Sequence, residues 1–253
     1  MNVRIFDSKV RLGEAAADAG AQAIAAAIAR NGIANIVVAT GASQFEMLAA
    51  LVEKPIDWSK VHAFHLDEYI GLPETHPASF RGYLKARFTS RLPTLGSFTF
   101  IAGDAADIDP ELARLNALIA RHPIDVMFAG IGENAHLAFN DPPADFEARE
   151  AFKVVNLDDA CRHQQFGEGW FESFEAVPKQ AISMSVPQIL KSGVIVIAAA
   201  DARKAAAVRD TLEGPVTPLC PASILQTHSD CRMFFDVPAT SLLSRKPAEV
   251  EIA

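Results

Sequence analysis

Apolar runs and helix-like segments alternate along the whole chain, and this alternation limits the folds that it can adopt. The runs at 33–39, 61–66, 124–129 and 194–199 have the length and the β-branched content of buried strands. Strands that alternate with helices form parallel sheets through right-handed crossovers. We therefore expect an α/β fold built on an open, mostly parallel, doubly wound (Rossmann-like) sheet with helices on both faces.

The remaining segments fit the same pattern from end to end. The expected strands, besides the four above, are 3–6, 97–101, 153–156, 180–184 and, as the last one, 232–235. The expected helices are 9–30, 44–52, 79–88, 110–121, 158–165, 187–191, 202–212 and 221–226. There is no internal repeat and no linker-like stretch, so residues 1–253 are predicted to form a single domain, with a loosely ordered tail from Pro238 onward.

Composition excludes several classes of partner. The net charge is −8 and there is no basic stripe, which argues against nucleic acid as a partner. No apolar run approaches the ~18 residues of a membrane span, and the first residues resemble a short strand rather than a signal peptide. Three cysteines without a CxxC pair fit a reducing compartment. We expect a cytoplasmic protein that contacts no membrane.

The segment 130–141 holds the densest group of chemically versatile side chains. It follows the apolar run 124–129 and reads Gly-Ile-Gly-Glu-Asn-Ala-His-Leu-Ala-Phe-Asn-Asp. Open α/β sheets place their chemistry where a strand ends in such a turn. Asn134 and Asp141 are close enough in sequence to hold His136 in one tautomer, ready to move a proton at a sugar ring oxygen. The alternative is a histidine with a structural role.

A second candidate is Asp67, which follows the strand expected at 61–66. Burial at a strand end would raise the pKa of this carboxyl and suit it to abstract a carbon-bound proton. In the alternative interpretation, Asp67 caps the following loop and Glu68 forms a structural ion pair.

Two further segments indicate an anion site. Gly41, within Thr40-Gly41-Ala42-Ser43, permits a tight turn at a helix start, where free N–H groups favour an anion. Lys204 lies in the first turn of a helix, where a cation needs an anionic partner. Helix capping and a solvated lysine are the alternatives. No set of side chains has metal-ligand spacing, and there is no Gly-x-Ser-x-Gly nucleophile.

Together these segments resemble the glucosamine-6-phosphate deaminase (isomerase) family, in family order across nearly the whole chain. The similar segments are Ala39-Thr40-Gly41-Ala42-Ser43, Leu66-Asp67-Glu68-Tyr69-Ile70-Gly71-Leu72, His76-Pro77, Ser79-Phe80, Gly130-Ile131-Gly132 through His136 to Phe139-Asn140-Asp141-Pro142, Val177-Pro178, Ala181-Ile182-Ser183-Met184, Arg203-Lys204-Ala205, Leu212-Glu213-Gly214 and Pro221-Ala222-Ser223-Ile224-Leu225. The 6-phosphogluconolactonases of the same superfamily typically have Asp-Glu-Arg at 67–69, where this chain has Tyr69. The resemblance therefore favours the deaminase branch.

The resemblance implies deamination of glucosamine 6-phosphate to fructose 6-phosphate and ammonia without a metal or an organic cofactor. His136 would assist ring opening, Asp67 would move the C2 proton to C1, and Asn134 and Asp141 would orient His136. The implied substrate-binding residues are Thr40, Gly41, Ala42, Ser43, Glu68, Gly132 and Lys204. The expected partner is a small phosphosugar, and a homo-oligomer is compatible with the resemblance.

Three departures from the family pattern bear on the substrate. Asp141 stands where the family often has the longer Glu, so the loop must close in or a water must intervene. Ala135 replaces the usual Gly and is strained if its φ is positive. The lid segment lacks the family's phosphate-binding arginine, for which Arg162 is a candidate replacement. The alternatives are a related phosphosugar isomerase or deaminase, a lactonase-type hydrolase, or a non-catalytic phosphosugar sensor.

Overall fold

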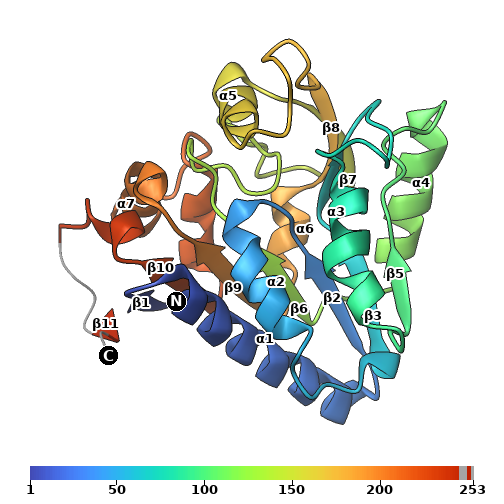
Figure 1. The fold of residues 1–253 in the computed structure, drawn as a ribbon, viewed down its shortest axis with the longest axis horizontal. Helices are drawn as coiled ribbons and strands as arrows, with labels where there is room; N and C mark the ends of the chain where they lie inside the picture. The colour runs from blue at the N-terminus through green and yellow to red at the C-terminus, as the bar shows by residue number, and fades with distance from the viewer. Residues whose placement is uncertain (245–249, 252–253) are drawn as a thin grey trace.

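An eight-stranded parallel sheet forms the centre of the protein (Figure 1). The computed structural model describes residues 1–244 and 250–251. The strand order is β11-β1-β10-β9-β6-β2-β3-β5, and every neighbouring pair is parallel. The strands are β1 (Asn2–Phe6), β2 (Ala34–Val38), β3 (Val61–His65), β5 (Ser97–Thr99), β6 (Val126–Ala129), β9 (Val194–Ala199), β10 (Cys231–Asp236) and β11 (Val250–Glu251). The predicted α/β fold class is confirmed.

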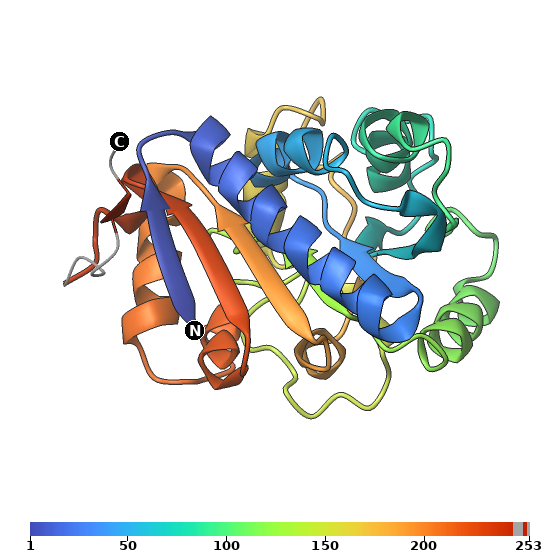
Figure 2. The same cartoon turned by 90° about the horizontal axis from the view of Figure 1, so that it is seen from below.

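Helices cover both faces of this sheet, and Figure 2 shows α1 running across one of them. The helices are α1 (Lys9–Asn31), α2 (Phe45–Leu51), α3 (Phe80–Arg87), α4 (Ile108–Ile119), α5 (Asp159–Gly167), α6 (Val186–Leu190) and α7 (Ala205–Glu213). Alternating strand side chains separate two cores. In β2, Ile36 packs with α1, α2 and α3, while Val37 packs with α4, α6 and α7.

The longest helix, α1, begins and ends at residues suited to those positions. The Ser8 side chain accepts a hydrogen bond from the backbone N–H of Arg11 at 3.4 Å, and Gly32 ends the helix with φ +81°. A Cβ on Gly20 would lie 2.2 Å from the Phe128 ring, so this glycine allows α1 to approach β6 closely. The Ala-rich helix thus seals one face of the sheet near its centre.

A separate antiparallel sheet corrects one expectation. The order is β4 (Asp67–Tyr69), β8 (Gln180–Met184) and β7 (Phe152–Asn156), whereas 153–156 and 180–184 were expected in parallel βαβ units. The burial of β7 alternates, as in an antiparallel sheet with one solvated face. Leu66 joins the two sheets, because its N–H bonds the Val38 carbonyl at 3.3 Å and its carbonyl accepts from Met184 at 3.0 Å.

Other differences occur near the C-terminus. The helix expected at 202–212 starts as a 3₁₀ turn, Ala202–Lys204, and the one expected at 221–226 is a 3₁₀ helix, Pro221–Thr227. The expectation of loose order from Pro238 onward is wrong for Pro238–Thr240, a 3₁₀ turn whose Ala239 is buried and bonds Asp236. β10 is also not the last strand, because β11 follows it. Residues 245–249 and 252–253 lie outside the described residues.

None of the helices in the described part of the chain combines the length and the apolarity needed to cross a membrane.

Candidate active site

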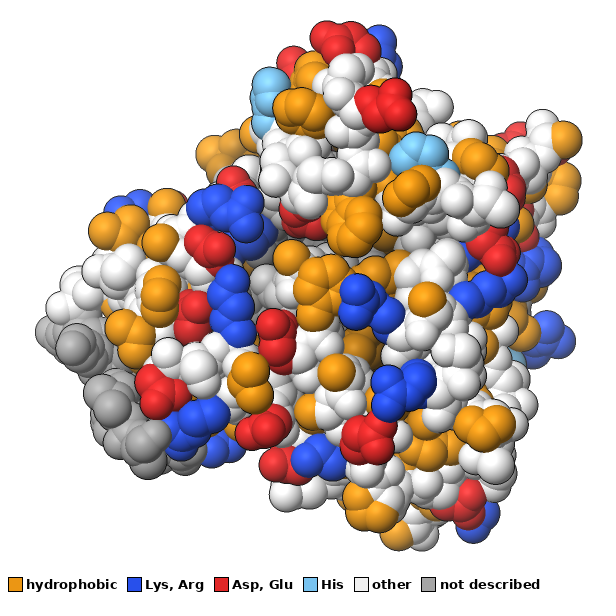
Figure 3. Space-filling model, in the orientation of Figure 1, with side chains coloured by type: hydrophobic (Ala, Val, Ile, Leu, Met, Phe, Trp, Pro, Cys, Tyr) orange, Lys and Arg blue, Asp and Glu red, His pale blue; other side chains and the backbone are white. Residues whose placement is uncertain are grey.

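A cavity of about 820 Å³, measured with its open mouth, lies at the carboxyl ends of β2, β3, β6 and β9. Parallel α/β sheets bind their ligands at this edge. The predicted residues that line it are Thr40, Gly41, Ala42, Ser43, Asp67, Gly132, His136 and Lys204. The other three predicted residues, Glu68, Asn134 and Asp141, lie behind its wall. On the face shown in Figure 3, basic and acidic side chains are interspersed and form no continuous basic band.

Asp67 begins β4 and faces the cavity from the junction of the two sheets. Its side chain is buried, at 6% exposure, and makes no hydrogen bond or ion pair within the described residues. Burial, and then the neighbouring charge of Glu68, raise the pKa of Asp67 to about 8. A carboxyl group with a pKa near the working pH suits a general base.

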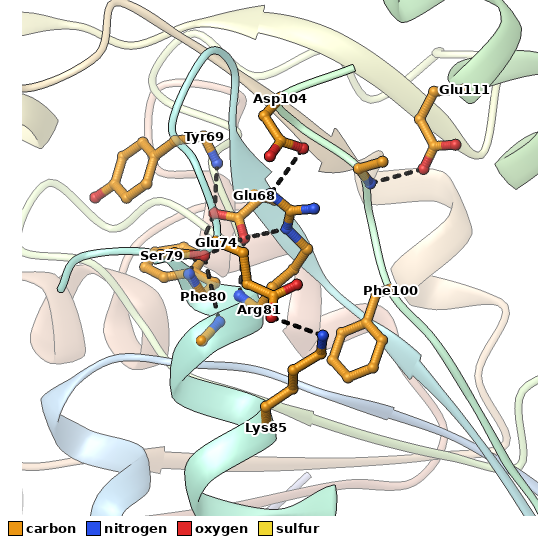
Figure 4. Close-up of polar contacts among 12 residues, drawn as sticks. Glu68, Tyr69, Glu74, Ser79, Phe80, Arg81, Lys85, Phe100, Asp104 and Glu111 are labelled. Atoms are coloured by element: carbon orange, nitrogen blue, oxygen red, sulfur yellow. Dashed lines mark hydrogen bonds and ion pairs between the residues drawn. The ribbon is translucent and has the colours of Figure 1, made fainter. Parts of the chain in front are cut away.

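Glu68 points to the opposite side of β4, where its carboxylate binds the start of α3 (Figure 4). Its carboxylate accepts hydrogen bonds from the backbone N–H groups of Tyr69 at 3.0 Å, Phe80 at 3.2 Å and Arg81 at 2.8 Å. It also accepts from the Ser79 hydroxyl at 3.2 Å and lies 3.7 Å from the Arg81 guanidinium. Burial raises the pKa of Glu68 to about 7, although the backbone hydrogen bonds and the charge of Arg81 act to lower it. The structure therefore shows the structural ion pair that was the alternative for Glu68, and no direct access to a ligand.

His136 lies on a tight turn in the segment 130–141. The Gly132 N–H bonds the His136 carbonyl at 3.0 Å, and the His136 N–H bonds the Asn134 side chain at 3.1 Å. A Cβ on Gly132 would lie 2.3 Å from the His136 ring, so only glycine leaves room for the ring there. Ala135 has φ +65°, which confirms that this position needs the left-handed region and strains the alanine.

Asp141 holds the inner side of the His136 ring. Its Oδ1 lies 3.1 Å from His136 Nδ1, in a contact that lacks hydrogen-bond geometry. The same oxygen accepts a hydrogen bond from the Asn134 side-chain amide at 3.1 Å. Its Oδ2 accepts from the Asp158 N–H at 3.0 Å. Burial opposes ionisation, but His136 and the two donors hold the pKa of Asp141 below its usual range. The loop has closed in, so the shorter side chain reaches His136 directly.

Cys161 lies beside this pair, and the donor atoms of Cys161, His136 and Asp141 all lie within 4.8 Å of one another. A small cation could bridge such a spacing. Burial, and then the charges of Asp141 and Asp158, raise the pKa of the Cys161 thiol, which opposes the thiolate that a metal ligand requires. The metal-free reaction therefore stays a prediction.

The anion end of the cavity combines a glycine turn with Lys204. Gly41 has φ +103° and precedes the 3₁₀ turn Ala42–Gln44, whose first N–H groups have no partner within the helix. The Lys204 side chain is buried, at 7% exposure, and makes no hydrogen bond or ion pair within the described residues. Burial lowers its pKa. A buried ammonium group without a partner, beside a helix start, fits an anion site.

Arg162 does not replace the missing phosphate-binding arginine, so this prediction is wrong. Arg162 does not line the cavity, because its guanidinium donates to the carbonyls of Phe174 at 3.0 Å and Val177 at 3.2 Å. Two other cations, Lys9 and Arg203, stand at the cavity instead. They come from α1 and from the turn before α7, so no local pattern around the lid could indicate them.

Three lid residues at the cavity were also missed. Gln164 accepts a hydrogen bond from the Glu133 N–H at 2.8 Å, and Gln165 accepts one from the Tyr69 hydroxyl at 2.8 Å. These bonds fasten α5 to the His136 turn and to β4. Glu168 follows at the end of α5. Its acid group at a helix C-terminus was the available signal, because the helix dipole disfavours an acid there.

Comparisons with known proteins identify the family of this chain. The family described as glucosamine-6-phosphate isomerases/6-phosphogluconolactonase matches residues 7–233. Glucosamine-6-phosphate deaminases from Oenococcus oeni and Lacticaseibacillus paracasei are 35% and 36% identical to this chain, covering 97% of it and 100% of their own lengths.

Solved structures agree as well. A monomeric glucosamine-6-phosphate deaminase superposes with a TM-score of 0.85 at 30% identity, covering 96% of this chain and 100% of its own. A 6-phosphogluconolactonase from Shewanella baltica shares the fold, with a TM-score of 0.77 at 19% identity over 94% of this chain and 98% of its own. The chain belongs to the glucosamine-6-phosphate isomerase/6-phosphogluconolactonase family of enzymes.

Proposed function

We propose that this protein converts glucosamine 6-phosphate and water into fructose 6-phosphate and ammonia. One observation carries the proposal: the carboxyl group of Asp67 and the ring of His136 face the same cavity, and the ammonium group of Lys204 lies in its wall. Within the part of the chain that the structure describes, neither the Asp67 nor the Lys204 side chain has a hydrogen-bond or ion-pair partner. Acid–base groups together with an anion site suit proton transfer within a sugar phosphate.

In the proposed mechanism, His136 moves a proton at the ring oxygen and opens the pyranose. Asp67 then removes the proton from C2 of the open-chain aldehyde and returns it to C1. The resulting C2 imine adds water and releases ammonia, which leaves the ketose. Asn134 and Asp141 act through His136 as positioning residues, because they contact its ring or backbone rather than the cavity.

The phosphate would lie on the turn at 40–43 and on Lys204. Backbone N–H groups at a helix start and a buried ammonium group both favour an oxyanion. Gly132 and the hydroxyl of Ser43 also line this cavity. Substitution of Lys204 by Met should raise KM by about 100-fold with a smaller effect on kcat, because one charged contact is worth roughly 2–3 kcal/mol.

Deamination is favoured over lactone hydrolysis by Tyr69. This residue stands where the lactonase pattern has an arginine, and it is fully buried with its hydroxyl bonded to Gln165. A phenol in that position supplies no cation to the cavity. The deaminase sequence pattern and the local structure therefore point the same way.

A coupled assay for ammonia and fructose 6-phosphate tests the proposal. We expect both products in equal amounts from glucosamine 6-phosphate, and little hydrolysis of 6-phosphogluconolactone. Phosphosugar binding without turnover would support a sensor instead. Lactone hydrolysis without ammonia release would assign the protein to the other branch of its family.

A further inference from the structure

Glu168 occupies an unfavourable position that its local contacts do not explain. It is the C-cap residue of α5, and Gly169 follows it with φ +82°. The negative end of a helix dipole destabilises an acid there. Within the described residues, the Glu168 carboxylate accepts one side-chain hydrogen bond, from the Gln164 amide at 3.5 Å. Violations of local preference of this kind concentrate at functional sites.

Glu168 lies at the anion end of the cavity, whose wall also holds Arg203, Lys204 and the turn at 40–43. Burial raises the pKa of Glu168, while Lys204 and Arg203 from the turn before α7 and the Gln164 amide lower it. The negative charge of Glu133, from the His136 turn, also raises the pKa of Glu168. The Glu168 charge also acts on the phenols of Tyr69 and Tyr83. Among the described residues, the other titratable side chains in the wall of this cavity are Lys9, Asp67, His136 and Asp201.

The partners of these charges differ. The Arg203 guanidinium lies 3.4 Å from Glu133 and 3.6 Å from Asp201, and Lys9 lies 3.6 Å from Asp201. Lys204 has no ion pair within the described residues. Among the described residues of this cavity, Lys204 is therefore the cation without an ion pair, and Glu168 is the lid carboxylate that it acts on.

We infer that Glu168 is a specificity-determining residue that discriminates anions by charge. Its carboxylate balances Lys204 when no ligand is bound. A dianion seated on the turn at 40–43 and Lys204 meets this carboxylate as a like charge, so the dianion binds with uptake of one proton by Glu168. A monoanion leaves the site nearly neutral and requires no proton. This inference rests on the anion position in the proposed function, but not on deamination.

Calorimetric titration with two inorganic probes tests the inference without turnover. Sulfate is a dianion and methanesulfonate a monoanion throughout pH 5 to 9, so neither probe titrates. We expect the sulfate affinity of the parent protein to fall as pH rises through this range, and methanesulfonate affinity to change less. Glu168→Gln should bind sulfate about 10-fold more tightly at pH 8.5, because it lacks the like charge.

Three comparisons make the outcome decisive. Glu172→Gln, an exposed acid of the same segment, should behave like the parent. Asp67 titrates in the parent and in Glu168→Gln alike, so their difference isolates Glu168. Sulfate binding by Glu168→Gln that is no tighter than the parent's at pH 8.5 would overturn the role of Glu168 alone. Sulfate binding that survives Lys204→Met unchanged would overturn the anion site itself.

Discussion

Asp67 and Glu68 are adjacent carboxylic acids in one short strand, yet the fold gives them opposite surroundings. Strand alternation turns Asp67 into the cavity, without a partner within the described residues, and turns Glu68 into the start of α3, where four donors meet it. Both are buried. The difference shows that burial alone does not distinguish a reactive acid from a structural one, whereas the number of hydrogen-bond donors does.

Asp67→Asn should have the largest effect on activity. The amide has the shape of the carboxyl group but accepts no proton, so kcat should fall by about 10³-fold or more. Phosphosugar affinity should stay close to that of the parent, because Asp67 makes no contact that the turn at 40–43 needs. Steady-state ammonia release and calorimetric binding measure the two quantities. Full activity in this variant would remove Asp67 from the mechanism.

Asp141→Asn should have an intermediate effect on activity. Asp141 has hydrogen-bond partners, as Glu68 does, but it influences the reaction through its contact with His136. The neutral amide no longer stabilises a protonated His136 ring, so kcat should fall by about 10- to 100-fold. KM should change little. Asp145→Asn, an exposed acid of the same loop, is the matched control. Equal activities of the two variants would leave Asp141 with a purely structural role.

Glu68→Gln should chiefly reduce stability. The neutral amide loses charge-assisted bonds to the start of α3, at an expected cost of about 2 kcal/mol in the free energy of unfolding. Folded protein should retain kcat within about 10-fold. Denaturant unfolding measures the change. Glu74→Gln, which removes the charge of the surface pair with Lys85 shown in Figure 4, should cost less than about 1 kcal/mol.

A further prediction concerns the pH dependence of stability. The pKa of Asp67 is about 8 in the folded protein and near 3.8 in the unfolded chain, so the folded state binds more protons between these values. This contribution to stability is present at low pH and is lost as pH rises through about 8. Asp67→Asn should therefore melt a few degrees above the parent at pH 9 and show a flatter pH profile. A lower Tm for the variant at pH 9 would contradict the raised pKa.

Much of the fold could be predicted from the sequence, because long apolar runs such as 194–199 specify buried strands whatever surrounds them. The antiparallel sheet could not be predicted in the same way. Its strand β4 has only three residues, and its pairing with β8 joins segments more than 100 residues apart. Short strands carry little periodicity, so only tertiary contacts identify them.

The candidate site shows the same division. Asp67 was identifiable because it follows an apolar run directly, and His136 because it lies in the glycine turn after another such run. The role of Glu68 could not be predicted, because adjacent side chains of a strand point to opposite faces and the sequence does not show which of the two faces the cavity. Arg162 misled the prediction because a lone arginine in a lid pattern does not reveal that carbonyls of the next loop bind it. Lys9 and Gln165 reach the cavity from elements far apart in the sequence, which no local spacing encodes.

The central claim is that Asp67 moves the C2 proton, and isotope exchange tests it most directly. Glucosamine 6-phosphate carrying deuterium at C2 is incubated with the parent and with Asp67→Asn, and the sugar is followed by NMR. The parent should move deuterium to C1 or release it to solvent, while Asp67→Asn should leave it at C2 even as the variant binds the sugar. Loss of deuterium from C2 at the parent's rate in Asp67→Asn would contradict the account.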